Sequence, residues 1–244
     1  PATQRRGFGA RFETSLSVFN TFLPIVRGQR VGLFAGSGVG KSTLMGALAG
    51  SIPADVTVVA LIGERGREVG DFIHRVLGPE AMKSTVVIAA TSDQSAMMRR
   101  MAAYSAMSVA EYFRDQGAQV VYFADSVTRL AEAHREVALS LGEAASMNGF
   151  PPSTSQAITR LAERAGPGAG ESGDITAIFS VLVAGSDMEG PVADILRGVL
   201  DGHVVLDREI AERGRYPAID VLRSVSRSLP HAATDEENKV LAIG

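Results

Sequence analysis

Residues 31–43 read VGLFAGSGVGKST, passing from a short apolar run through a glycine cluster to a Lys-Ser pair. Glycines in such a loop let consecutive backbone N–H groups turn inward around phosphate oxygens. The helix expected from Lys41 points its positive end at the same oxygens. The stretch therefore predicts a phosphate-binding loop between a strand, 31–35, and a helix, 41–49.

This loop predicts a site for a nucleoside triphosphate and Mg²⁺. Lys41 would reach the β- and γ-phosphates, and the Ser42 hydroxyl would ligate Mg²⁺. Ala35 stands where the strict motif has glycine, which is tolerable if its φ is negative. A glycine-rich turn with a chance Gly-Lys-Ser is the alternative, and the flanking strand and helix disfavour it. The loop residues expected to bind ATP are Gly36, Ser37, Gly38, Val39, Gly40, Lys41, Ser42 and Thr43.

The rest of the chain alternates between buried apolar runs and helical stretches, which predicts an α/β fold. Runs without polar alternation are typical of a mostly parallel sheet with helices on both faces, of the doubly wound type. The expected strands are 31–35, 56–62, 85–90, 119–124, 175–183 and 203–206. The clearest helices are 41–49, 94–116 and 126–141, and long loops are expected at 142–155 and, as a mobile connection, at 166–173.

Carboxylates follow two of these strands and are candidates for metal binding and catalysis. Asp125 ends the run 119–124 and would reach Mg²⁺ at the carboxyl edge of the sheet, although an N-cap role is the alternative. Glu64 directly follows 56–62, where it could deprotonate the attacking water. Glu68, one turn later, could bind a water of the Mg²⁺ shell. A solvated run of alternating charge explains the segment that holds Glu64 and Glu68 equally well on spacing alone.

Composition excludes several classes of protein. The 24 basic and 27 acidic residues give a net charge of −3, which disfavours nucleic acid as the main partner. No cysteine is present, so thiolate chemistry is excluded. No apolar run reaches the ~18 residues of a membrane span. The four histidines show no metal-ligand spacing, and Met97, Met98, Met101 and Met107 are explained best by packing of one long helix.

Four motifs in order carry a resemblance to a known family. They are GSGVGKS (36–42), GERGRE (63–68), ADSVTR (124–129) and YPAIDVLRSVSR (216–227). These resemble the catalytic subunits of rotary ATP synthases, and more closely the flagellar and type III secretion export ATPases. That family also carries alanine at the position of Ala35. The likeness covers about residues 25–228 and implies a RecA-like ATPase core.

The resemblance implies roles for residues in three of the motifs. Glu64 would be the general base, and Arg65 with Glu68 would connect this base to the Mg²⁺ shell. Arg129 would contact Glu64 or the γ-phosphate region. The alternative is that this run of charged residues only lies on the solvated surface.

Two further roles follow from the last motif. Tyr216 matches the aromatic residue that stacks on adenine, and its alternative is a half-buried loop tyrosine. Arg227 matches an arginine finger that reaches the neighbouring subunit's site, and its alternative is a surface or structural arginine. A guanidinium supplied in trans would stabilise the charge on the γ-phosphoryl group and would make hydrolysis depend on assembly.

As a whole, the resemblance implies Mg-dependent ATP hydrolysis that energises protein export through a flagellar type III apparatus. A virulence-type secretion ATPase and a non-catalytic ring subunit are the alternatives, although Glu64 argues against the second. An RNA translocase is disfavoured by the acidic net charge. The implied partners are other copies in a hexamer, export-apparatus proteins and a stator-like regulator, at the cytoplasmic face of the bacterial membrane.

The expected organisation is a lead-in segment (1–24), the ATPase core (25–228) and the start of a C-terminal region (229–244). Full export ATPases of this kind carry a ring-sealing β-barrel before the core and a helical domain after it. We therefore expect this chain to be an excised core, mostly monomeric and slow in hydrolysis.

Overall fold

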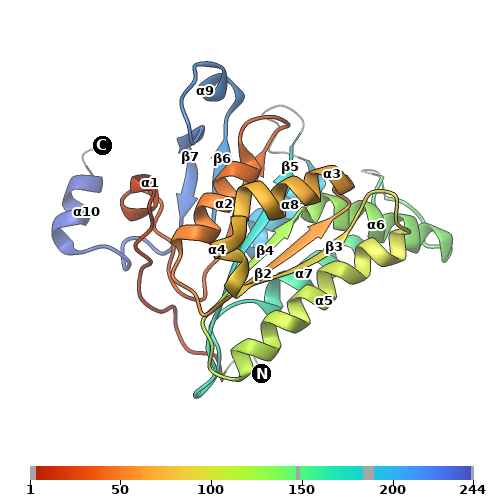
Figure 1. Ribbon diagram of the computed structural model, residues 1–244, viewed down its shortest axis with the longest axis horizontal. Coiled ribbons are helices and arrows are strands. Elements are labelled where there is room, and N and C mark those ends of the chain that lie inside the picture. The colour runs from red at the N-terminus through yellow and green to blue at the C-terminus, as the bar shows by residue number, and fades with distance from the viewer. Residues whose placement is uncertain (1–3, 147–148, 184–189, 243–244) are drawn as a thin grey trace.

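The computed structural model describes residues 4–146, 149–183 and 190–242, and its centre is one seven-stranded sheet (Figure 1). The strands are β1 (Arg30–Ala35), β2 (Val56–Ile62), β3 (Thr85–Ala90), β4 (Val120–Asp125), β5 (Ile175–Leu182), β6 (Gly202–Leu206) and β7 (Ile219–Ser226). Their order is β3-β2-β4-β5-β1-β6-β7. All neighbours pair in parallel except β6 and β7. The carboxyl ends of six strands thus meet at one edge of the sheet.

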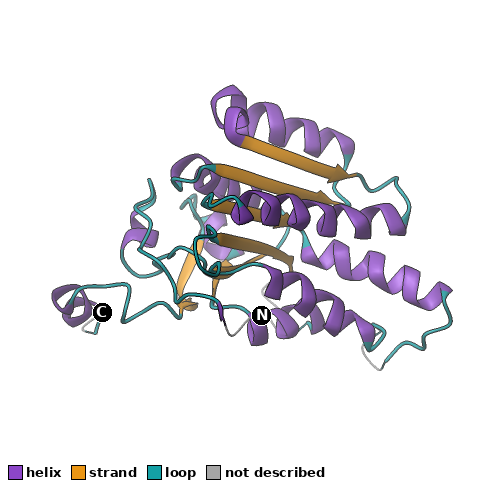
Figure 2. Ribbon diagram, turned by 90° about the horizontal axis from the view of Figure 1, so that it is seen from below, coloured by secondary structure: helices purple, strands orange, loops and turns teal. Residues whose placement is uncertain are grey.

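Helices cover both faces of the sheet (Figure 2). The helices before β4 are α1 (Ser17–Asn20), α2 (Lys41–Ser51), α3 (Gly66–Asp71), the π-helix η2 (Phe72–Leu77), α4 (Gly78–Ala81), the 3₁₀ helix η3 (Met82–Ser84) and α5 (Ala96–Asp115). The helices after β4 are α6 (Val127–Ser140), α7 (Ser153–Arg164), α8 (Pro191–Val199), α9 (Arg208–Glu212) and α10 (Asp235–Leu241). Helices α5 to α8 pack on one face, and α2 with η2 packs on the other. This layering confirms the predicted α/β fold class.

Two apolar cores, one on each face, hold the sheet in place. The inner strands β1, β2, β4, β5 and β6 are buried on both sides, as parallel strands between helical layers must be, whereas the edge strands β3 and β7 are partly exposed. On the α5 face, small residues such as Ala103 and Ala106 allow the helix to approach the sheet closely, and Tyr122 donates its hydroxyl to the Ala103 carbonyl at 3.2 Å. The other core reaches into the first segment of the chain, where Phe12 and Phe19 are buried.

The six predicted strands and three predicted helices are all present, each with bounds within two residues of expectation. The chain also forms elements that the apolar pattern did not reveal, notably α7, α8 and the edge strand β7. Among the described residues, no helix has both the length and the apolar character needed to cross a membrane.

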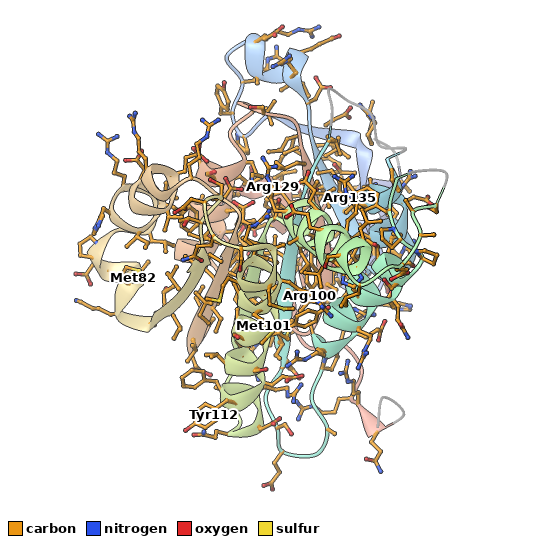
Figure 3. All side chains as sticks on the ribbon, turned by 90° about the vertical axis from the view of Figure 1, so that its right-hand side faces the viewer. Met82, Arg100, Met101, Tyr112, Arg129 and Arg135 are labelled. Carbon is orange, nitrogen blue, oxygen red and sulfur yellow. The ribbon has the colours of Figure 1, made fainter. Side chains whose placement is uncertain are left out.

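Two expectations need correction. Met97, Met98 and Met101 are about half exposed, and only Met107 of the four is buried. The buried face of α5 is formed by Ala102, Ala103, Ala106, Met107 and Ala110, and the three methionines lie on the opposite face. Figure 3 shows Met101 and Tyr112 on this exposed side. The segment 166–173 is also no loose connection, because the Asp174 carboxylate accepts a hydrogen bond from the Gly168 N–H at 3.0 Å within it.

Candidate functional site

The predicted phosphate loop joins β1 to α2 at the carboxyl edge of the sheet. Gly38 and Gly40 have φ values of 78° and 90°, which a residue with a side chain adopts only at a cost. No described residue other than glycine has a positive φ, so Ala35 meets the condition placed on it. Gly40 is the N-cap of α2 and provides no side chain to cap it. The first N–H groups of the helix therefore remain available to an anion.

This loop forms one wall of a cavity of about 950 Å³. The expected residues that line it are Gly36, Ser37, Gly38, Gly40, Lys41, Ser42, Thr43, Glu64, Arg65, Glu68 and Arg129. Val39 points its side chain into the core instead and can contribute only its backbone. The structure thus brings together the loop, the segment after β2 and the start of α6, as the motifs predict.

Lys41 and Asp125 meet at the floor of the site. The Lys41 ammonium forms an ion pair with Oδ1 of Asp125, and both side chains are almost fully buried. Oδ1 also accepts a hydrogen bond from the Ser180 hydroxyl at 2.6 Å. Ser126, rather than Asp125, caps α6 by accepting a hydrogen bond from the Arg129 N–H. The N-cap alternative for Asp125 is therefore wrong, and its carboxylate faces the phosphate loop.

Glu64 follows β2 in an environment that favours its neutral form. Burial raises its pKa, and the negative charges of Asp125 and Glu68 raise it further, while Lys41 lowers it. The net effect raises the pKa of Glu64 to about 7. A carboxylate with a pKa near neutrality is well matched to accepting a proton from water. Backbone hydrogen bonds from Gly63 to Ala90 and from Ser92 to Glu64 hold this segment against the end of β3.

The other charged residues surround this carboxylate more loosely. Arg129 donates to Glu132 at 2.9 Å and not to Glu64, although its side chain packs on Gly63. The negative charge of Glu64 is among the causes that raise the pKa of Arg129, after its hydrogen bond to Glu132. Arg65 and Glu68 form an exposed ion pair at 3.7 Å. Exposed pairs of this kind contribute little energy, so both side chains are free to rearrange around a ligand.

The donor set fits Mg²⁺. Ser42, Glu68 and Asp125 offer hard oxygen atoms, and Mg²⁺ is commonly held by one or two carboxylates, a hydroxyl and the substrate phosphates. Asp125 has its Oδ1 engaged by Lys41 and Ser180, which aligns the carboxylate. No cluster of three acidic or histidine ligands exists within the described ranges, and none is needed for a metal that shares its shell with phosphate.

Tyr216 and Arg227 lie at opposite ends of β7. The Tyr216 ring lies beside the phosphate loop, where a methyl group added to Gly40 would sit 3.4 Å from the ring. Arg227 follows β7 near the other edge of the sheet, and its N–H donates to the carbonyl of Asp201. The structure thus brings Tyr216 to the site and leaves Arg227 away from it.

Sequence reasoning missed several residues of the site. Ser180 on β5 orients Asp125, and Arg99 on α5 pairs with Glu136 on α6 at 2.9 Å within the cavity. Neither pair is close in sequence, and serine within an apolar strand or arginine on a helix carries no local signal. Only the sheet order brings them to the loop.

A glycine loop at a helix N-terminus, a buried lysine and a carboxylate at the end of β4 define a P-loop nucleotide-binding domain. Comparison with known families then places the chain. Residues 15–226 match the model of the ATP synthase alpha/beta family, nucleotide-binding domain. The protein belongs to this family.

Individual relatives are also similar over nearly the whole chain. The flagellum-specific ATP synthase of Bacillus subtilis is 50% identical over 236 residues, which are 97% of this chain and 52% of the relative. The protein of the same name from Salmonella typhimurium is 50% identical over 224 residues, 92% of this chain and 49% of the relative. The chain spans about half the length of these curated relatives.

Solved structures agree. A prototypical ATPase from the type III secretion system of pathogenic bacteria superposes with a TM-score of 0.92 at 44% identity, covering 98% of this chain and 68% of that chain. The assembled ATPase EscN from the enteropathogenic E. coli type III secretion system gives 0.93 at 44% identity, with 98% and 57% covered.

Proposed function

We propose that this protein hydrolyses ATP with Mg²⁺ and that hydrolysis energises protein export through a flagellar type III secretion apparatus. One observation carries the hydrolytic part of the proposal. Lys41 and Glu64 line one cavity beside a phosphate loop whose amides are free, and Asp125, from a third segment, forms an ion pair with Lys41. A binding module has no need of a carboxylate with a pKa near 7 at this position.

In the proposed reaction, the loop amides hold the phosphates and Lys41 turns from Asp125 to the β- and γ-phosphate oxygens. The Asp125 carboxylate, still held by Ser180, then faces the metal position with Ser42. Glu64 orients the attacking water and accepts its proton, with Arg129 and Arg65 beside it. Tyr216 stacks on the adenine ring. Bound Mg²⁺ supplies positive charge that stabilises the phosphate oxygens.

The export part of the proposal is supported by the relatives. Curated relatives at about half identity are named flagellum-specific ATP synthases. A virulence-type secretion ATPase is the second candidate, because the superposed structures belong to such systems at 44% identity. Measuring export of flagellar subunits in a deletion strain complemented with the gene distinguishes the two.

We further propose that the full-length protein works as a hexameric ring of identical subunits, in which Arg227 completes the site of a neighbour, whereas the chain alone is mostly monomeric. Support comes from the relative described as an assembled ATPase and from another solved in complex with its central stalk EscO. We place it in the cytoplasm, at the inner face of the membrane, with export-apparatus proteins and a stator-like regulator as partners. Residues 25–228 form the proposed core, flanked by 1–24 and 229–244.

The hydrolytic proposal is tested by replacing the buried lysine. Lys41→Ala removes the cation that would bind the phosphates, so we expect loss of ATP binding measured by calorimetry, together with loss of phosphate release. Lys83→Ala is the control, because Lys83 is exposed and pairs only with Glu80. Unchanged binding in Lys41→Ala would overturn the proposed site.

A further inference from the structure

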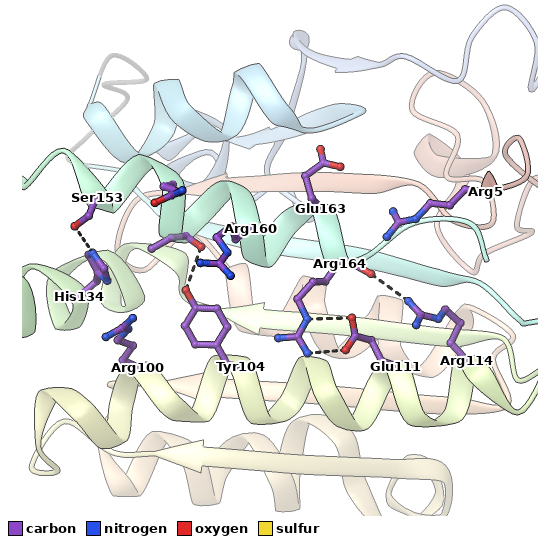
Figure 4. Close-up of a pocket in the computed structure, with 12 residues that line it drawn as sticks. Arg5, Arg100, Tyr104, Glu111, Arg114, His134, Ser153, Arg160, Glu163 and Arg164 are labelled. Atoms are coloured by element: carbon purple, nitrogen blue, oxygen red, sulfur yellow. Dashed lines mark hydrogen bonds and ion pairs between the residues drawn. The ribbon is translucent and has the colours of Figure 1, made fainter. Parts of the chain in front are cut away.

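A second cavity, of about 790 Å³, lies between α5, α6 and α7 (Figure 4). It shares no lining residue with the nucleotide cavity. Its volume is within the range of small-molecule sites. The residues lining it are Arg5, Arg100, Tyr104, Glu111, Arg114, His134, Ser153, Gln156, Ala157, Arg160, Glu163 and Arg164. None of these residues has a part in the proposed ATPase reaction.

The lining is strongly basic once internal pairs are considered. Glu111 accepts two hydrogen bonds from Arg164, at 2.6 and 3.0 Å, in a bidentate pair between α5 and α7. Glu163 is paired outside the cavity with Arg30 at 2.7 Å. Both carboxylates in the lining are therefore neutralised. Arg114 pairs with Asp115 at 2.7 Å, whereas Arg5, Arg100 and Arg160 form no ion pair with a described residue.

Two guanidinium groups have no partner at all. Neither Arg100 on α5 nor Arg160 on α7 forms a hydrogen bond or an ion pair with any described residue. Arg100 is half-buried, Arg160 is exposed, and Figure 4 shows Arg100 to the left of the Tyr104 ring and Arg160 above it. The Tyr104 hydroxyl is itself committed to the carbonyl of Ala157 at 3.2 Å. Two unpaired cations that lie near one ring provide a place for an anion.

A buried histidine adds an unsatisfied polar atom to the same end of the cavity. His134 is only 7% exposed, and its Nε2 lies 2.7 Å from the Ser153 hydroxyl. That hydroxyl donates its one hydrogen to Glu143 at 2.6 Å, so it accepts from His134 Nε2–H. The Nδ1 atom is buried and has no partner. Buried polar atoms are normally hydrogen-bonded, so an orphan beside two free guanidiniums indicates a ligand.

The positive field around this histidine agrees with that reading. Burial lowers the pKa of His134, and the charge of Arg100 lowers it further. Figure 4 shows the ring between Ser153 and Arg100. A bound anion would offset the charge of Arg100 and so change the environment of the ring.

We propose that this cavity is a second anion site that binds a phosphate group through Arg100 and Arg160, next to His134. A phosphate dianion matches two guanidinium forks better than a single carboxylate, because it carries two charges on three accepting oxygens. The cavity leaves room beyond that group, so a small organic phosphate fits as well as the free ion. The adjacent residue Arg99 faces the nucleotide cavity, so α5 contributes to both sites.

The experiment uses the 244-residue chain with its nucleotide site filled by excess Mg²⁺ and a non-hydrolysable ATP analogue. Inorganic phosphate and glycerol 2-phosphate are titrated while the labelled imidazole rings of histidine are followed by NMR. We expect the His134 resonances to shift and saturate at millimolar phosphate or below. His203, which stacks on Phe34 away from the cavity, is the internal control and should not shift.

The variant Arg100→Gln with Arg160→Gln should weaken phosphate binding at least tenfold while leaving the fold intact, as judged by circular dichroism. Arg208→Gln, which removes an exposed arginine on α9, should not change it. Succinate, a dianion of two carboxylates, should bind at least tenfold more weakly than phosphate. A shift that does not saturate, equal binding in the double variant, or equal binding of succinate would each overturn the proposal. None of these outcomes bears on hydrolysis at Lys41.

Discussion

The Glu64 side chain is the residue on which turnover most directly depends. Glu64→Gln keeps the size and position of the group but cannot accept a proton. We expect ATP binding to stay within a few-fold and hydrolysis to fall by about 10²–10⁴-fold, the usual contribution of a positioned general base. Phosphate release under single-turnover conditions measures the chemical step, and binding of a fluorescent ATP analogue measures affinity.

A matched control is available outside the cavity. Glu80→Gln removes an exposed carboxylate of α4 that pairs only with Lys83. We expect this variant to hydrolyse ATP as the parent does. Turnover that survives in Glu64→Gln would assign the base to another group, with Glu68 the next carboxylate in the cavity.

The raised pKa of Glu64 also predicts a pH dependence of stability. In the metal-free and nucleotide-free protein its pKa rises from 4.5 to about 7, so between these values the folded state holds a proton that the unfolded state has lost. Ionising Glu64 therefore lowers the free energy of unfolding as pH rises through this window. Glu64→Gln should remove this loss of stability. The variant's free energy of unfolding should exceed that of the parent by about 2 kcal/mol at pH 8 and by almost nothing at pH 4.5.

Urea unfolding of both proteins at the two pH values measures this difference. Glu80→Gln controls for the change in net charge. A stabilisation by Glu64→Gln that is equal at both pH values would show that relief of ionisation is not its cause.

At the scale of single residues, the sequence predicts the site residues that follow strands or lie in the glycine loop, but not those within helices and strands. Lys41, Glu64 and Asp125 could be predicted because a strand end or a glycine loop marks each of them. Ser180 could not, since its role depends on which strand lies beside β4. The direct ion pair between Lys41 and Asp125 was also not foreseen, because the motif describes the two residues with phosphate already between them.

At the scale of elements, the β1–loop–α2 unit depends on a glycine with a left-handed conformation. Gly40→Ala forces a side chain into φ of 90° at the helix N-cap, which costs about 1–2 kcal/mol and displaces the amides that face phosphate. We expect lower stability by thermal unfolding and weaker ATP binding by calorimetry.

Gly50, in the last turn of the same helix, is the matched control. Its φ is not positive and an added methyl group would meet no atom within 4 Å. Gly50→Ala should therefore stabilise the protein, by about 0.5–1 kcal/mol, and leave ATP binding unchanged. Replacing glycine by alanine thus changes stability in opposite directions at these two positions. Equal effects at both would contradict the role given to Gly40.

Elements with a strong apolar period were predictable, and those shaped by their neighbours were not. The run 56–62 forms a strand with the expected bounds because burial on both faces requires unbroken apolar sequence. The run 85–90 also forms a strand with the expected bounds, although this edge strand is only partly buried. Strand β7 was missed since, as an edge strand, it exposes residues such as Leu222 and has mixed composition. The turn from α3 into the π-helix η2 likewise has no signature in composition.

For the whole molecule, the direction of β7 separates the two ends of the last motif. Its start pairs Ile219 with Leu206 near the phosphate loop, and its end pairs Ser226 with Gly202. Arg227 therefore lies near the start of β1, whereas the loop follows Ala35, five residues further along that strand. At about 3.3 Å per residue, the two edges are about 17 Å apart.

In the full-length protein, which we propose forms the ring, this separation predicts complementation between two inactive variants. Lys41→Ala disables a subunit's own site, and Arg227→Ala disables the finger that it would offer to a neighbour. Each should lower hydrolysis strongly when assembled alone. In an equal mixture, about a quarter of the interfaces would join an intact Lys41 site to an intact Arg227, if subunits assemble head to tail in a closed ring.

Hydrolysis by the mixture should thus recover to about a quarter of the parental rate per subunit. The control mixes the Lys41→Ala variant with a double variant that carries both Lys41→Ala and Arg227→Ala. No interface in this mixture holds both intact groups, so no recovery is possible. If Arg227 acted within its own subunit, the first mixture would stay as inactive as its components, because neither chain would hold both groups. Recovery therefore requires that Arg227, which lies about 17 Å from the phosphate loop of its own subunit, reaches the phosphate loop of another copy.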